Sequence, residues 1–177
     1  MLLFACAPAT ARAQATAALP PCAEPAAGSR RVTTLGGRVS IALPDGMVRV
    51  SDAELARAGA GGVVPSMVLM GDSGHAAVFV YTVNEVARVD RADYQESRQR
   101  LAETGTRGYD RWLGTEVVEQ GGARWLRQAY VSRDGLFEIR HLRYIVGLDG
   151  RTVFADIIYR ASARGWGRKL EDAGASL

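Results

Sequence analysis

The fold is decided by residues 112–160, WLGTEVVEQGGARWLRQAYVSRDGLFEIRHLRYIVGLDGRTVFADIIYR. Stretches rich in Val, Ile, Trp, Tyr and Phe alternate there with short turns that contain glycine. Such stretches favour strands, and glycine permits the positive φ that tight turns need. The strands that we expect are 112–119, 123–131, 136–146 and 152–160. Consecutive strands joined by tight turns pair antiparallel, so this part of the chain predicts a four-stranded meander.

Two more pairs of strands are expected before the meander, each around a turn. Pro44-Asp45-Gly46 is one turn, and Gly71-Asp72-Ser73-Gly74 is a hairpin loop. The strands expected around these turns are 38–43 with 47–50, and 66–70 with 76–83. The ordered part of the chain is expected to begin near Arg30.

Three helices are expected. Ser51 and Glu54 form a capping box that opens a short helix ending near residue 58. Asp90 caps a longer helix that runs to about residue 104. The residues expected on the apolar stripe of this longer helix are Tyr94, Ser97 and Leu101, with Ala102 beside them. A closing helix is expected over 163–173, and one side of it carries Trp166, Leu170 and Ala173.

The order of these elements predicts the fold class. Consecutive antiparallel hairpins with a few helices indicate α+β, here an antiparallel β-sheet meander flanked by helices in a single domain. The length of 177 residues also suits one domain. The sequence holds no Walker loop and no Gly-x-Gly-x-x-Gly between a strand and a helix, which disfavours a nucleotide-binding domain.

The charge of the chain disfavours nucleic-acid binding. Lys+Arg number 22 and Asp+Glu 19, which gives a formal charge of +3. Acidic and basic residues interleave along residues 90–103, and no run of five like charges occurs. A nucleic-acid interface gathers its basic residues on one face, so we expect no nucleic-acid partner.

The first residues suggest export. Residues 1–15 are apolar and Ala-rich, and the small-x-small sites that end at Ala13 and Ala15 are typical of signal peptidase cleavage. A cytosolic protein with an Ala-rich N-terminus is the alternative. Residues 3–6, Leu-Phe-Ala-Cys, resemble a lipobox, so the protein is expected to be periplasmic or secreted, or to be a lipoprotein anchored through Cys6. Residues 16–29 are a Pro/Ala-rich linker that contains Cys22, and we expect residues 30–177 to form the domain.

No catalytic, cofactor or metal site is expected. Gly71-Asp72-Ser73-Gly74 matches the core of the nucleophile loop of trypsin-like proteases, and His75 follows it. That family needs a His upstream of its Ser, and none precedes Ser73, so a polar hairpin turn is the preferred interpretation. Two His and two Cys supply no Cys/His set with metal-ligand spacing.

His141 and the tryptophans are the other residues singled out. Strand alternation places Ile139, His141, Arg143 and Ile145 on one face of their strand. We expect a solvated sheet surface there, with an anion site as the alternative. Trp112 and Trp125 are expected to pair across neighbouring strands, either as core or as a recognition surface.

The sequence also resembles the PsbP-like family. The resemblance is carried by residues 41–47 (Ile-Ala-Leu-Pro-Asp-Gly-Met), by Gly121-Gly122 before a Trp-containing strand, and by residues 154–162 before the last helix. The family includes photosystem II PsbP, a eukaryotic Ran-binding import factor and bacterial envelope proteins such as the DcrB-like lipoproteins. The resemblance implies that residues 30–177 form an antiparallel sheet flanked by helices that acts as a binding or assembly module without catalytic residues.

Three functions are therefore considered. The preferred hypothesis is an exported, non-enzymatic module that contacts another envelope protein of unknown identity through its sheet or a loop edge. Membrane attachment is expected only if Cys6 is lipidated. The alternative is a small-ligand or lipid carrier in the periplasm. The residues expected to line its apolar cavity are Val78, Val80, Leu142 and Ile157. A hydrolase that uses Ser73 and His75 is the third hypothesis.

Overall fold

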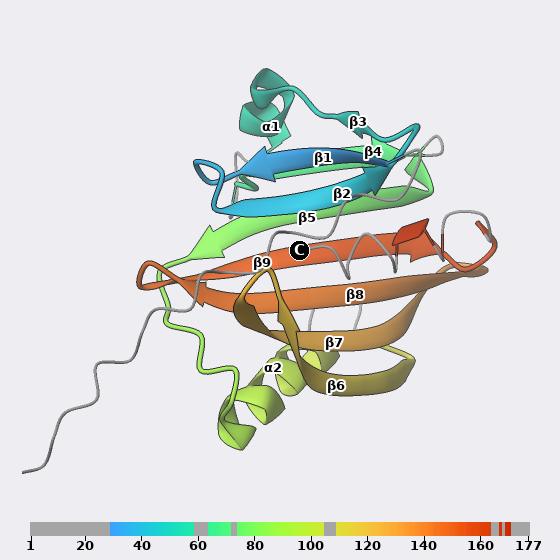
Figure 1. Cartoon of the computed structure of the whole chain (residues 1–177). Coiled ribbons are helices and arrows are strands. Elements are labelled where there is room, and N and C mark those ends of the chain that lie inside the picture. The colour runs from blue at the N-terminus through green and yellow to red at the C-terminus, as the bar shows by residue number, and fades with distance from the viewer. Residues whose placement is uncertain are drawn as a thin grey trace, which may run out of the picture.

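The computed structural model describes residues 29–58, 64–71, 74–104, 109–163, 167 and 169–170. It is built mainly of antiparallel strands (Figure 1). The strands are β1 (Ser29–Thr34), β2 (Val39–Pro44), β3 (Val48–Arg49), β4 (Met67–Gly71), β5 (Ala76–Val83), β6 (Arg111–Gln120), β7 (Ala123–Asp134), β8 (Phe137–Leu148) and β9 (Arg151–Arg160). The helices are α1 (Asp52–Ala58) and α2 (Ala92–Thr104).

The described strands form one large sheet and one small sheet. The large sheet has seven strands in the order β3-β4-β5-β9-β8-β7-β6, and all of its pairs are antiparallel. The pairing of β5 with β9, from Ala76↔Tyr159 to Val83↔Thr152, joins the N-terminal hairpin to the meander. The second sheet, β1 with β2, lies over one face of the large sheet, and α2 lies beyond the other face (Figure 1).

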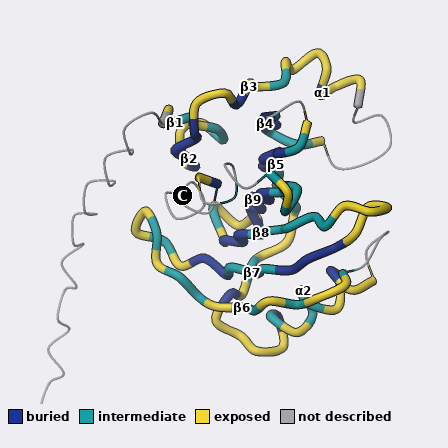
Figure 2. Tube along the Cα trace, turned by 90° about the vertical axis from the view of Figure 1, so that its right-hand side faces the viewer, coloured by how far each residue is buried: buried dark blue, intermediate teal, exposed yellow. Residues whose placement is uncertain are grey.

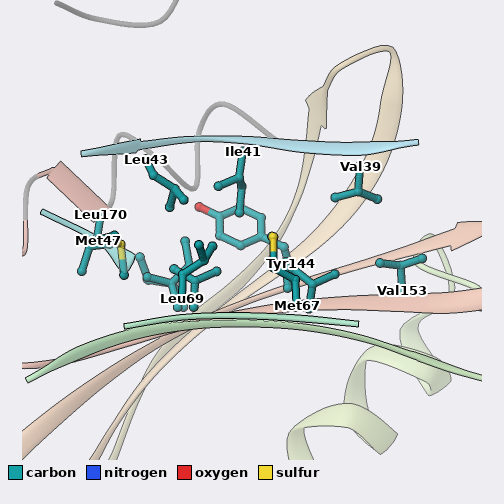
Figure 3. Packing of buried hydrophobic residues seen from close by; sticks show 14 of the residues in the cluster. Val39, Ile41, Leu43, Met47, Met67, Leu69, Tyr144, Val153 and Leu170 are labelled. Carbon is teal, nitrogen blue, oxygen red and sulfur yellow. The ribbon is translucent and has the colours of Figure 1, made fainter. Parts of the chain in front are cut away.

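The main core lies between the two sheets. Val39, Ile41 and Leu43 point from β2 toward the large sheet, where Leu69 and Tyr144 are among the residues that meet them (Figure 3). Alternation along β2 explains this arrangement, because every second side chain of a strand points to the same side. Leu170, in the helical segment after β9, is fully buried in the same cluster.

Most of the elements predicted from the sequence are confirmed. The four strands of the meander, the strands around the two N-terminal turns and both helices lie within a few residues of the predicted bounds. The capping box is present, since the Ser51 amide donates to Glu54 at 3.0 Å and the Glu54 amide to the Ser51 hydroxyl at 3.4 Å. Gly167, Lys169 and Leu170 are helical, and the rest of the predicted closing helix after residue 163, Trp166 included, lies outside the described residues.

Two structural predictions are confirmed only in part. The domain is an antiparallel sheet with helices, but it is richer in strands than predicted, because the β1–β2 pair covers one face of the large sheet (Figure 1) and β1 was not predicted at all. On the predicted stripe of α2, Tyr94 and Ala102 are buried, whereas Leu101 is 52% exposed and was placed wrongly. Within the described ranges, no helix is both long and apolar enough to span a bilayer.

Candidate functional site

Helix α2 covers part of the face opposite the β1–β2 pair. Tyr94, Arg98 and Ala102 recur every four residues and therefore lie on the same side of the helix. The guanidinium of Arg98 lies 4.9 Å from the ring centre of Tyr94 and 5.5 Å from that of Phe154, and it pairs with Glu85. Most other residues of α2 are exposed or half-buried (Figure 2).

Strand register arranges the side chains of this face in transverse rows, because directly paired residues point to the same side. An apolar row packs with Val89 and Tyr94 and contains Val117, Leu126, Ile145, Phe154 and Tyr81. Next to it, the polar row contains Thr115, Gln128, Arg143 and Asp156. The aromatic row follows with Trp112, Tyr130, His141 and Ile158. The last row, which we call the outer row, contains Ser132, Ile139 and Arg160.

The polar row holds a buried ion pair. Arg143 donates from Nε and Nη2 to the two carboxylate oxygens of Asp156 at 2.7 and 2.8 Å, and the Tyr81 hydroxyl donates to Asp156 at 3.2 Å. Burial lowers the pKa of Arg143, but the charge of Asp156 and its hydrogen bonds outweigh this effect and leave the pKa raised. Burial, and then the Asp156 charge, raise the pKa of Tyr81.

The polar row also contains unpartnered groups. The side chain of Gln128 is fully buried, and neither its oxygen nor its nitrogen has a hydrogen-bond partner among the described residues. The same is true of the Thr115 hydroxyl, which lies on the neighbouring strand. Buried polar groups are nearly always hydrogen-bonded in folded proteins. The unpartnered side chains of Gln128 and Thr115 are exceptions to this rule, so apolar residues would fill these positions at a lower cost.

The aromatic row is stacked across three strands. The Trp112 and Tyr130 rings lie 5.7 Å apart at an interplanar angle of 5°, and the Tyr130 and His141 rings lie 4.5 Å apart at 6°. His141 Nε2 is hydrogen-bonded to Ser132 Oγ at 2.8 Å. Burial is the main reason that the pKa of His141 falls to about 4, and Arg143 adds to this effect against the opposing charge of Asp156.

A bulge brings Trp112 into this row. The pairing shifts between Trp112↔Tyr130 and Gly114↔Ala129, so Leu113 is an extra residue in β6. One extra residue turns the following side chains to the other face. Gly114 has a φ of 150°, which favours glycine. The predicted pairing of Trp112 with Trp125 was therefore wrong, because Trp125 faces Val118 in the main core.

A groove of about 430 Å³ lies over the aromatic and outer rows. Its floor includes Ser132, Ile139, His141 and Arg160, and Leu101 contributes from α2. The tip of the β7–β8 hairpin lies beside it. Leu136 at this tip is completely exposed and Phe137 is 47% exposed, and the guanidinium of Arg160 lies 4.1 Å from the Phe137 ring centre.

The residues singled out from the sequence are only partly brought together. His141 and His75 both line the groove, and the hydroxyl beside His141 is that of Ser132, which sequence reasoning did not single out. Ser73 lies outside the described residues. The predicted face of Ile139, His141, Arg143 and Ile145 is confirmed by the strand register, but His141 lies half-buried in a groove rather than on a solvated surface. The hairpin register could have placed Ser132 near His141, because the two-residue turn at Gly135-Leu136 fixes it.

The residues expected around an apolar cavity lie elsewhere. They are packed in the main core between the two sheets, and they are Val78, Val80, Leu142 and Ile157. The groove thus has a different lining from the cavity expected of a lipid carrier.

Comparisons with known proteins support the fold. No protein family model and no curated protein matches the sequence. The solution structure of cyanobacterial PsbP (CyanoP) from Synechocystis sp. PCC 6803 matches with a TM-score of 0.60 and 13% identity, over 85% of this chain and 91% of that one. A Pseudomonas aeruginosa protein of unknown function matches with a TM-score of 0.45 and 8% identity, over 84% of this chain and 95% of that one. The likeness to CyanoP confirms the predicted PsbP-like fold, and at this identity it concerns the fold alone.

Proposed function

We propose that this PsbP-like domain is an exported, non-enzymatic binding module that holds another envelope protein against the groove beside α2. The observation that carries the proposal is a set of exposed apolar side chains at and beside the groove, here called its rim. Leu101 lines the groove and is 52% exposed, and Leu136 and Phe137 at the adjacent hairpin tip are 100% and 47% exposed. Exposed apolar side chains that surround a concave site are typical of surfaces covered by another protein. Export rests on the signal-like residues 1–15.

The chemistry of the groove favours binding over catalysis. Ser132 and His141 form a hydrogen-bonded pair, but a His with a pKa of about 4 is a weak base at neutral pH. The nearby carboxylate, Asp156, is engaged by Arg143 and Tyr81. A Ser–His pair needs a carboxylate that orients the His and donors that stabilise an oxyanion before it becomes a strong nucleophile.

A small-ligand carrier is the second candidate. The volume of the groove, about 430 Å³, falls in the range of small-molecule sites. A small molecule on the groove floor would leave Leu136 at the hairpin tip exposed, whereas a protein partner covers both the floor and the rim.

Site-specific photo-crosslinking in the native cell envelope tests the proposal. A photoreactive amino acid replaces Leu136, and the matched control replaces Val48, which is 67% exposed on strand β3 at the far edge of the sheet. We expect one reproducible protein adduct from position 136 that is absent from position 48. An adduct of equal yield at both positions, or none at position 136, contradicts the proposal. A small molecule co-purifying at one per chain favours the carrier.

A further inference from the structure

We infer that the groove recognises a carboxylate of its protein partner, an Asp or Glu side chain within an aliphatic segment, and that Arg160 anchors this carboxylate. The inference rests on the proposed function and names the chemistry of the partner.

Arg160 differs from the arginines of β8, β7 and β6, the three strands that follow β9 in the sheet. Each arginine of β6, β7 and β8 has a carboxylate oxygen 2.7 to 3.9 Å from its guanidinium; these residues are Arg111, Arg124, Arg127, Arg133, Arg140 and Arg143. Among the described residues, Arg160 has no such carboxylate, although Asp134 lines the same groove. Its guanidinium lies over the Phe137 ring instead. Arg160 therefore presents a charge that the described part of the chain does not neutralise.

The stacking on Phe137 prepares Arg160 to bind a carboxylate. A guanidinium that lies on a ring keeps its N–H donors at its edge, where they fit the two oxygens of a carboxylate. Contact with the ring also restricts the side chain, which reduces the entropy lost on binding. The backbone of Arg160 is fixed as well, because its amide donates to the His75 carbonyl at 3.0 Å.

The side chains around Arg160 indicate which residues should flank the acidic residue in the partner's segment. Ile139 lies directly opposite Arg160 on β8, and Ile158 is the neighbouring groove residue of β9. Leu101 faces them from α2 across the groove. Ser132 and His141 are polar neighbours, and His75, Asp134 and Arg143 also line the groove. A segment with an acidic residue next to aliphatic ones complements this arrangement, and the exposed Leu136 indicates that the carboxylate belongs to a protein.

The test is an NMR titration of the ¹⁵N-labelled protein with three probes. They are acetyl-Leu-Glu-Leu-amide, its neutral counterpart acetyl-Leu-Gln-Leu-amide, and hexanoate as a free carboxylate with an apolar tail. We expect the Glu peptide to shift the Arg160 side-chain signal and the Ile139 amide, and the Gln peptide to bind about tenfold more weakly. Hexanoate is expected to bind more weakly than the Glu peptide.

Variants separate the role of Arg160 from a general charge effect. Arg160→Gln is expected to abolish the preference for the Glu peptide, and Arg160→Lys to retain part of it. Arg140→Gln is the matched control, because Arg140 lies on β8 with its side chain on the opposite face. Equal binding of the Glu and Gln peptides, no binding of the Glu peptide at millimolar concentration, or a preference that survives Arg160→Gln overturns the inference. Hexanoate binding as tightly as the peptide overturns a protein as the source of the carboxylate.

The crosslink at position 136 keeps the two proposals distinguishable. If the adduct forms as expected and survives Arg160→Gln, the proposed function stands and the carboxylate inference fails. If no adduct forms, the proposed function fails whatever the peptides do.

Discussion

The buried ion pair between Arg143 and Asp156 provides a direct test of the site's architecture. Asp156 accepts two hydrogen bonds from Arg143 and one from Tyr81, and its side chain is 12% exposed, against 21% for Arg143. Removing one member of such a pair leaves the other charge uncompensated in a place with little water. We therefore expect Asp156→Leu and Arg143→Met each to lower the free energy of unfolding by about 3–5 kcal/mol.

The double variant is expected to recover most of this loss. With both charges gone, the remaining cost is about 1–3 kcal/mol, since the half-buried Tyr81 hydroxyl loses its acceptor. The coupling energy between the two positions is then about 3 kcal/mol or more. Urea unfolding followed by tryptophan fluorescence measures all four proteins, provided that the urea dependence of the free energy stays the same among them.

An exposed ion pair of similar geometry is the control. Arg38 Nη1 and Asp149 Oδ2 lie 2.8 Å apart, and the two side chains are 53% and 63% exposed. The same cycle on this pair should give a coupling below about 1 kcal/mol, because water and side-chain entropy offset its attraction. A coupling of that small size between Arg143 and Asp156 would refute the reasoning and show that the polar row is open to solvent.

Three further predictions concern the same domain. Stability contributed by His141 is present above pH 6.5 and is lost as the pH falls to about 4, because the unfolded chain then binds a proton that the folded one does not. The loss is about 3 kcal/mol; in pH-dependent urea unfolding His141→Gln should remove it, and a loss of the same size in this variant would contradict the prediction. Gln128→Met should stabilise the domain by about 1–2 kcal/mol, and an unchanged or lower melting temperature would mean that the amide is hydrogen-bonded in solution. Ser51→Ala should cost about 1 kcal/mol in the same unfolding assay, and no loss would mean that the capping box is not formed.

The meander was predictable because its pairing is local. Each of its strands meets the next one through a turn of two residues, so the alternation of apolar side chains and the positions of the glycines determine the register. The joining of β5 to β9 was not predictable in this way. It pairs residues 69 to 83 positions apart in the chain, and nothing in either segment identifies its partner.

The wrong predictions have physical causes. β1 contains Arg30, Arg31 and two threonines, so it shows no apolar alternation, and it forms by pairing its backbone with β2. Part of the stripe of α2 was misjudged because a hydrophobicity scale treats Arg98 as polar. In the structure, Arg98 lies among aromatic rings and pairs with Glu85. Trp112 stacks on Tyr130 because of a single extra residue at the bulge. Gly114 within a strand is the sequence signal that could have revealed it.

The position of the groove follows from two lengths, although its chemistry does not. α2 has 13 residues and is about 20 Å long, whereas β7 and β8 each have 12 residues and extend about 40 Å. Even if it ran along the strands, the helix could cover only about half of them, so an uncovered end of the sheet is unavoidable. The sequence predicted both lengths closely enough for this conclusion. Which residues line the groove there depends on the hairpin register, which places Ser132 and Arg160 on its floor, whereas the bulge at Leu113 places Trp112 beside Tyr130. Deleting Leu113 removes the bulge, so Trp112 should turn to the other face of the sheet and lose its contact with Tyr130, while the polar row stays intact. NMR cross-peaks between the rings of Trp112 and Tyr130 measure this contact, and their persistence in the deletion variant would contradict the prediction.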